Sequence, residues 1–201
     1  MTKGIVSTPQ PEATETGIEV LRRGGNAVDA AIATALVQGV VDPQMCGIAG
    51  FGSMQVYLPK AGIHTFIDFH GKTPAAATPE MWQDLIVGEA RDGFGFFLQG
   101  HVNDVGYQSV TVPGSLKAYF EAQTEFGCMD WGDVAAPAIE HAQPGVRIRP
   151  HMHSFWTRDD GSGRVLTQER LRFTEVGRRI YFHPDGRLKG LGETLQNPDM
   201  A

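Results

Sequence analysis

The chain has 201 residues, of which 41% are hydrophobic and 20% are charged, as is usual for a globular protein. Its formal net charge of −6 argues against a nucleic acid or an anionic membrane surface as a partner. Cys46 and Cys128 are the only cysteines and belong to no Cys-x-x-Cys pair or Cys/His cluster, which argues against a zinc site. We interpret them as two small buried thiols, although the sequence also permits a disulfide between them.

The N-terminal residues lack the apolar stretch of a signal peptide. As written, the sequence therefore predicts a cytoplasmic protein, whereas a missing leader would make it periplasmic or secreted. The most apolar stretch, residues 27–41, is too short for a typical membrane span and is interrupted by Asp29, Gln38 and Gly39. We therefore expect no membrane partner.

The first elements in chain order are a short strand and a helix. We expect the strand over residues 4–8 and the helix over residues 13–23. Gly24 and Gly25 should end this helix, because glycine readily adopts the left-handed backbone that closes many helices.

A second helix is predicted over residues 27–41. Asn26 is a suitable N-cap, and Asp29 lies near the positive end of the helix dipole. The helix has almost no polar face, which is typical of a helix buried inside a larger body. Pro43 should stop it, because the residue before a proline avoids helical backbone angles.

A glycine-rich turn and a hairpin are expected next. The turn covers residues 47–52, and strands are predicted over residues 53–58 and 64–69. Residues 59–62, Pro-Lys-Ala-Gly, have the composition of the turn that joins two such strands.

The remainder of the chain is predicted to be mainly helical. A short helix is expected over residues 78–84 and an irregular, glycine-rich segment over residues 87–106. Longer helices are expected over residues 116–126 and 131–142. The last residues, 198–201, resemble the first turn of a further helix, and we therefore expect a split or truncated gene product.

Two clusters in the C-terminal third were considered as sites. His151 and His153 could bind a metal if they lay on one face of a strand, but no acidic or sulfur ligand stands near them, so no metal site is expected. A group of four arginines is interpreted as a solvated helical face; its members are Arg170, Arg172, Arg178 and Arg179.

Residues 24–54 read GGNAVDAAIATALVQGVVDPQMCGIAGFGSM. With the residues before them, they resemble the start of the gamma-glutamyltransferase (gamma-glutamyltranspeptidase) family. In that family a helix ending in L-R-x-G-G-N-A-V-D-A-A precedes a G-I-G-G-G-type turn, which here is Gly-Ile-Ala-Gly-Phe-Gly. The resemblance continues in register through residues 68–69, 74–77, 112–115, 137–139 and 197–201.

The resemblance implies an α+β fold of the N-terminal-nucleophile hydrolase type, an α-β-β-α sandwich that is incomplete in this chain. It implies that residues 1–201 form the N-terminal part of a large subunit, with a strand and helix portion over 1–78 and a mainly helical portion over 79–201. The nucleophile of the family is a threonine in a Thr-Thr context, and no Thr-Thr pair occurs here. A complementary chain would therefore carry the catalytic threonine, and we assign no catalytic residue to this chain.

The resemblance also implies a substrate-binding position. Family enzymes carry an arginine that pairs with the α-carboxylate of the glutamyl donor, and His70 stands at its place here. Histidine cannot present the same planar fork, so the donor specificity is open. Lys72 is the second candidate for binding the anion. The alternatives are a structural hydrogen bond for His70 and a solvated surface position for Lys72.

Three functions remain after these observations. The first is a fragment of an amidohydrolase or acyltransferase that acts on gamma-glutamyl amides such as glutathione. The second is an acylase-like branch with a different acyl donor, and the third is a catalytically inactive split-gene remnant. None of them requires a cofactor or a metal.

Overall fold

The computed structural model describes residues 4–91 and 93–201. The chain divides into two compact units, each of which is described by itself. The first unit comprises Met1–Lys72, Pro113–Val146 and Gln196–Ala201, and the second comprises Thr73–Val112 and Arg147–Leu195.

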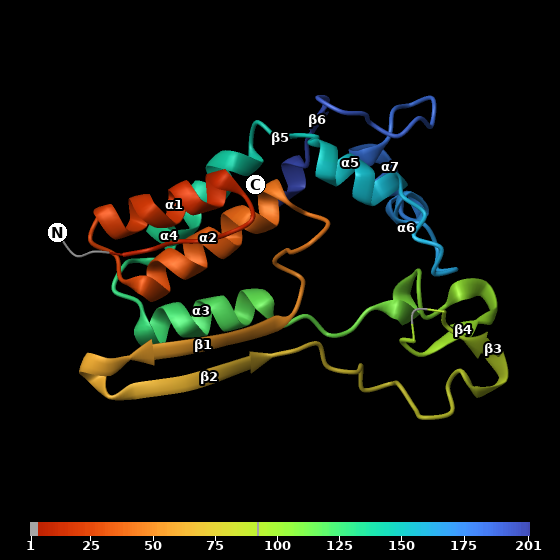
Figure 1. Cartoon of the computed structure of the whole chain (residues 1–201), viewed down its shortest axis with the longest axis horizontal. Coiled ribbons are helices and arrows are strands. Elements are labelled where there is room, and N and C mark those ends of the chain that lie inside the picture. The colour runs from red at the N-terminus through yellow and green to blue at the C-terminus, as the bar shows by residue number, and fades with distance from the viewer. Residues whose placement is uncertain (1–3, 92) are drawn as a thin grey trace. The chain divides into compact units, whose positions relative to one another are not determined.

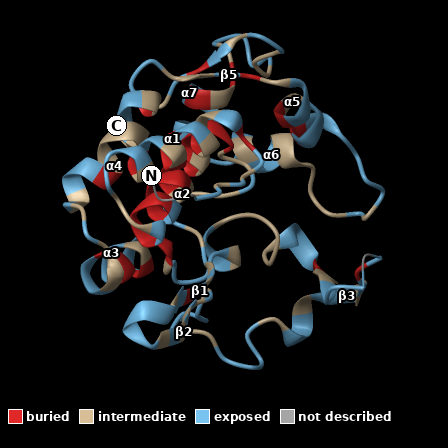
Figure 2. Ribbon diagram, turned by 60° about the vertical axis from the view of Figure 1, so that its left-hand side comes forward, coloured by how far each residue is buried: buried red, intermediate tan, exposed pale blue. Residues whose placement is uncertain are grey.

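The first unit is built around α2 (Ala27–Val41), the predicted apolar helix. It packs against α1 (Pro11–Arg22), α4 (Trp131–Ala142) and, less extensively, α3 (Ser115–Phe126). Burial is concentrated along α2, as Figure 2 shows in red. Removal of this much aliphatic surface from water drives the packing, at about 25 cal/mol per Å² of apolar surface buried.

The ends of the first two helices follow the sequence closely. Asn26 caps α2 as predicted, because its side chain accepts hydrogen bonds from the backbone N–H groups of Val28 and Asp29. Asp29 returns a hydrogen bond by accepting the N–H of Asn26 at 2.6 Å, which completes a capping box. Gly24 has φ of +98°, a conformation that favours glycine, and it separates the two helices.

A two-stranded antiparallel hairpin completes this unit. Strand β1 (Gly52–Leu58) pairs with β2 (Ile63–Phe69) in a register that places Gly52 opposite Phe69 and Leu58 opposite Ile63. The 3₁₀ turn Pro59–Ala61 and the left-handed Gly62 join the strands, so the predicted hairpin is confirmed. Helix α3 runs alongside the hairpin in Figure 1, and Val56 of β1 is buried in the core shared with α2.

The strand predicted over residues 4–8 is wrong. These residues are extended but belong to no strand. A strand requires a partner for its backbone N–H and C=O groups. In the part of this unit that the structure describes, β1 and β2 pair only with each other, so residues 4–8 lie along the helices instead.

The second unit contains short elements. Its helices are α5 (Pro150–Thr157), α6 (Thr167–Arg172) and α7 (Glu175–Tyr181), and its hairpin pairs β3 (Ile86–Glu89) with β4 (Phe96–Leu98). The two-residue strands β5 (Val146–Arg147) and β6 (Thr194–Leu195) form a further pair. Trp156 of α5 is fully buried and meets the Tyr181 ring edge-on, at 5.5 Å between centroids.

Two predictions fail in this unit. The helix expected over residues 78–84 is replaced by successive i to i+3 turns and the 3₁₀ helix Gln83–Leu85, because Met81 and Gln83 donate to carbonyls three residues back instead of four. The segment expected to be irregular, residues 87–106, contains most of the β3–β4 hairpin. Its strands are only three and four residues long and carry a register irregularity, so their alternating pattern is weak.

None of the helices in the described part of the chain combines the length and apolarity needed to cross a bilayer.

Candidate substrate-binding site

The site predicted from the sequence lies at the end of the β1–β2 hairpin. His70 directly follows β2, and its backbone N–H donates to Asp68 Oδ1 at 2.9 Å, which turns the chain as the strand ends. The imidazole ring lies against Phe51, with 4.6 Å between ring centroids and 34° between ring planes. His70 is exposed, so this ring contact leaves the residue accessible to solvent.

The loop before β1 is fastened to the start of α3. The carbonyl oxygen of Gly50 accepts the N–H groups of Gly114 and Ser115 at 2.9 and 3.2 Å. These are two of the N–H groups that a helix leaves unpaired at its first turn. The loop that carries Phe51 is therefore held by backbone bonds rather than left free.

Close backbone packing at Gly114 also fixes the end of β2 against the start of α3. A Cβ atom built on Gly114 would lie 2.7 Å from the carbonyl oxygen of Phe69, so only glycine fits there without movement. The Phe69 ring meets Tyr119 of α3 edge-on at 5.8 Å between centroids. Burial raises the pKa of the Tyr119 phenol, which a hydrogen bond to Ser115 partly offsets. The end of β2 is thus anchored to α3 just before His70.

Lys72, the second predicted residue, is exposed two positions after His70. It makes no ion pair with the residues that the structure describes. The structure therefore places His70 and Lys72 at the hairpin end but does not join them through a shared partner among the described residues.

A buried carboxylate that the sequence analysis treated only as a helix-dipole residue proves to hold the helices together. Asp29 is fully buried, and its oxygens accept from Gln123 Nε2 at 2.5 Å and from the N–H groups of Cys128 and Met129 at 3.0 and 3.1 Å. Burial works to raise the pKa of Asp29, but these hydrogen bonds and those of Cys128 Sγ and Asn26 outweigh it and lower the pKa. The sequence does show an acidic residue within an otherwise apolar helix. It does not show the hydrogen-bond donors, because Gln123, Cys128 and Met129 lie about 100 residues away.

The two cysteines are free, and only part of their prediction holds. Cys46 is half-buried, and its burial with the nearby Asp42 carboxylate raises its thiol pKa to about 11. Cys128 is exposed rather than buried, because it lies in the loop between α3 and α4, although its thiol bonds Asp29. That hydrogen bond raises the thiol pKa of Cys128 as well. Neither thiol is activated, since the thiolate is the reactive form.

The two histidines considered for a metal lie on a helix, not a strand. His151 and His153 belong to α5, where residues two positions apart do not share a face. Among residues 4–91 and 93–201, no three His, Cys, Asp or Glu side chains are grouped as metal ligands.

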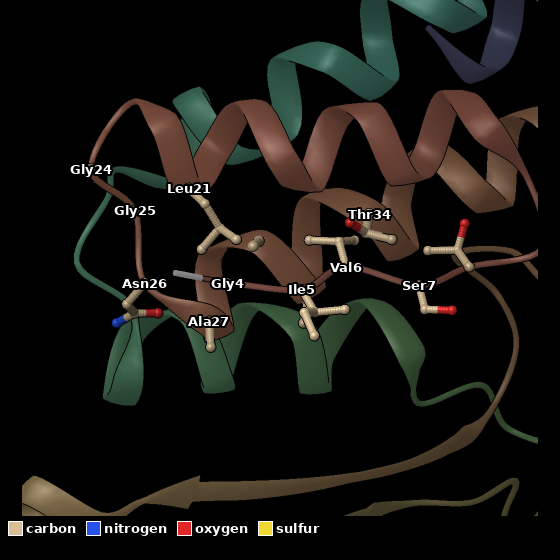
Figure 3. A pocket seen from close by; sticks show the side chains of 13 residues that line it. Gly4, Ile5, Val6, Ser7, Leu21, Gly24, Gly25, Asn26, Ala27 and Thr34 are labelled. Atoms are coloured by element: carbon tan, nitrogen blue, oxygen red, sulfur yellow. The ribbon is translucent and has the colours of Figure 1, made fainter. Parts of the chain in front are cut away.

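A pocket of the first unit does not have His70 among its lining residues. It has a volume of about 780 Å³ and runs between the extended residues 4–8 and the facing parts of α1 and α2 (Figure 3). No charged side chain is among its lining residues in the described chain. Asn26, its one amide side chain, already accepts from Val28 and Asp29 and donates to the Phe126 carbonyl. The described lining residues therefore offer no side chain for acid–base chemistry.

Comparison with known proteins identifies the family of this chain. The model of the gamma-glutamyltranspeptidase family matches residues 13–201. The chain belongs to this family. A curated relative, the glutathione hydrolase proenzyme of Bacillus subtilis (strain 168), is 32% identical over 198 residues, which are 98% of this chain and 31% of the relative. The acylase ACY 1 proenzyme of Pseudomonas sp. (strain SE83) is 36% identical over 161 residues, 79% of this chain and 28% of the relative.

A solved structure of the gamma-glutamyltranspeptidase family agrees with this chain over its whole length. The gamma-glutamyltranspeptidase of Helicobacter pylori has a TM-score of 0.82 and 25% identity, with 100% of this chain and 52% of that chain covered. The predicted α+β fold of the N-terminal-nucleophile hydrolase type is thereby confirmed. The chain spans about a third or less of the two curated relatives and about half of the solved gamma-glutamyltranspeptidase chain.

Proposed function

We propose that this gamma-glutamyltranspeptidase-family chain supplies the scaffold and the substrate-anion site of an amide-cleaving enzyme. The substrates are gamma-glutamyl amides such as glutathione, and a complementary chain supplies the catalytic threonine. The observation that carries the proposal is the geometry of His70, which follows β2 with its backbone N–H bonded to Asp68 and its ring against Phe51. The family resemblance aligns this residue with the carboxylate-binding arginine. Residues 1–78 would enter the complete enzyme as its strand and helix portion, and residues 79–201 as its mainly helical portion.

In this proposal His70 is the main contact to the donor carboxylate and Lys72 adds positive charge. A protonated imidazole donates hydrogen bonds from either ring nitrogen, but it lacks the two parallel donors of a guanidinium. Binding of the carboxylate should therefore be weaker than with arginine. The exposed Lys72 ammonium stands two residues along the chain, where it can attract the same anion over a longer distance.

A second candidate is an acylase that cleaves a different side-chain amide. The observation in its favour is the 36% identity to the acylase ACY 1 proenzyme, a higher identity than to the B. subtilis glutathione hydrolase proenzyme. Gamma-glutamyl and glutaryl groups share a terminal carboxylate and differ in the α-ammonium group. An anion site at His70 would serve both donors, so the ammonium decides between the two activities.

The test reconstitutes the chain with a complementary polypeptide that carries the Thr-Thr motif, and then measures anilide release. Three donors separate the candidates: a gamma-glutamyl anilide, a glutaryl anilide and a neutral butyryl anilide. The proposed function predicts the highest kcat/KM for the gamma-glutamyl anilide, and the acylase predicts it for the glutaryl anilide. Preference for the butyryl anilide would exclude an anion site, and absence of all cleavage in a stable complex would favour the inactive remnant.

A further inference from the structure

Residues 4–8 run as an extended segment past α1 and α2 without a partner strand (Figure 3). Within residues 4–91 and 93–201, the backbone N–H and C=O groups of residues 4–7 make no hydrogen bond. An extended backbone with a row of open donors and acceptors is a template on which another strand can pair. The segment therefore presents an open hydrogen-bonding edge.

Side chains hold this segment in place. Val6 packs where α1 has a glycine: a Cβ atom built on Gly17 would lie 2.8 Å from Cγ1 of Val6. At the other end of the segment, Oγ1 of Thr8 lies 3.1 Å from Oγ1 of Thr14 in α1. The extended conformation is thus set by contacts to α1 and does not depend on strand pairing. A strand that is already ordered loses less conformational entropy when a partner binds.

The alternate side chains of the segment point away from these contacts. Figure 3 shows Ile5 and Ser7 on the side opposite to Val6, as the two-residue period of an extended chain requires. Ile5 is 95% exposed, and Ser7 is exposed as well. Isoleucine is among the residues most often buried in folded proteins. Ile5 is therefore a candidate contact for a partner.

Helix α2 leaves one apolar face open beside the same segment. Ala27 and Ala31 are exposed, and their spacing of four residues places them on one face of the helix. Both alanines line the pocket of about 780 Å³, together with residues 4–8. Other parts of α2 pack against α1, α3 and α4. Small side chains at Ala27 and Ala31 allow a neighbouring backbone to approach closely.

We propose that residues 4–8 are a docking strand, to which the complementary polypeptide adds a strand that also covers Ala27 and Ala31. The identity of this partner rests on the proposed function. This chain covers 52% of the solved Helicobacter pylori chain, so that protein has nearly as much polypeptide again from which a strand can come. Backbone hydrogen bonds would give the affinity. The side chains of the added strand that face the pocket should be small or apolar, because no charged side chain is among its described lining residues.

The first test is amide hydrogen exchange, followed by NMR, on the full 201-residue chain alone and bound to the complementary polypeptide that carries the Thr-Thr motif. In the chain alone, the amides of residues 5–7 should exchange at nearly the rate of an unstructured peptide. Successive N–H groups of a strand point to opposite edges, so pairing should slow at least every second amide by about 100-fold or more.

A second test measures the affinity of the two polypeptides for each other by calorimetry. I5K should weaken the complex about tenfold, because it places a charge in an apolar contact. It should leave the thermal unfolding midpoint of the chain alone unchanged, since Ile5 is almost fully exposed. The matched control is I139K, on the exposed side of α4 and outside the pocket lining, which should leave the affinity unchanged. Equal weakening by both variants would overturn the proposal.

The outcomes separate this proposal from the proposed function. Anilide cleavage by a complex in which residues 5–7 all keep their free exchange rates would overturn the docking strand and leave the proposed function standing. Slowed exchange in a complex that cleaves no anilide would do the reverse. Protection that appears in the chain alone as its concentration rises would assign the edge to a second copy and overturn the proposal, as would failure of the two polypeptides to associate.

Discussion

The thiol of Cys128 lies 3.0 Å from Oδ2 of Asp29, and the backbone N–H of the same cysteine lies 3.0 Å from Oδ1. Through this pair the start of α2 is bonded directly to the loop that joins α3 and α4. Gln123 and Met129 donate to the same carboxylate, so three segments meet on one buried charge. A carboxylate that accepts this many hydrogen bonds is stable in its ionised form even when buried.

Replacement of Asp29 by asparagine should destabilise the chain strongly. The amide keeps the shape of the side chain but presents a donor where two acceptor oxygens are needed, so some of the buried N–H groups lose their partners. We expect a loss of about 3 kcal/mol in the free energy of unfolding, which is the range for disrupting a buried charge network. Urea unfolding of the full chain measures it.

The control for this substitution is D133N. Asp133 is exposed and makes one long ion pair, 3.6 Å to Arg23. Exposed pairs contribute about 0–1 kcal/mol, so D133N should leave the unfolding midpoint nearly unchanged. Equal losses for D29N and D133N would show that the buried network has no special role.

The contribution of Asp29 to the stability of the folded chain should be lost in acid. Its pKa in the folded chain lies below the ordinary value of 3.8, so the folded state favours the ionised form. The stabilisation is therefore fully present above pH 3.8 and is lost as the pH falls through the folded pKa. We expect the stability difference between the wild type and D29N to be constant between pH 5 and 8 and to shrink below about pH 4. A difference that grew on acidification would contradict the assignment.

Glu193 should titrate far below an ordinary glutamate. The N–H of Gly190 donates to its Oε2 at 2.5 Å, and with His183 and Arg187 it lowers the pKa of Glu193 to about 2. The Gly190 bond is the largest cause, so H183N should raise the pKa only part of the way toward 4.5. Carbon-13 NMR of the carboxyl group follows both titrations. A midpoint near 4.5 in the wild type would show that this bond is not formed.

Two glycines provide a matched test of packing at the candidate site. Gly114→Ala should destabilise the chain by about 1–3 kcal/mol, because the new Cβ would overlap the Phe69 carbonyl oxygen. Gly132→Ala places the same methyl group on α4, where nothing lies within 4 Å. Alanine favours helices, so this second change should stabilise the chain by a few tenths of a kcal/mol, up to about 1. Thermal unfolding compares the two, and equal shifts would contradict the close approach at Gly114.

The parts of the fold that the sequence predicts well are those set by local rules. The N-cap at Asn26, the apolar α2 and the hairpin turn at residues 59–62 each depend on residues a few positions apart. The same local rules also predict a strand that does not form. Residues 4–8 have the composition of a strand, but strand formation depends on a neighbour, and the described part of this unit offers them none.

The candidate site also has some features that the sequence predicts and others that it does not. The place of His70 after β2 follows from the motif. Its stacking on Phe51 depends on how the hairpin returns after 19 residues, and the tie from Gly50 to Gly114 depends on a return after 64 residues. The interpretation of Arg172 and Arg178 as parts of one helical face is wrong, because they lie on two helices, α6 and α7, and Thr174 caps the second.

The most direct measurement of the central claim is the KM of the reconstituted enzyme for a gamma-glutamyl anilide with H70R. Because arginine presents a carboxylate-binding fork that histidine lacks, KM should fall about tenfold. The control H64R adds the same charge to the exposed face of β2, six residues before His70, and should leave KM unchanged. A KM that does not respond to H70R, or that responds equally to H64R, would contradict a substrate-anion site at His70.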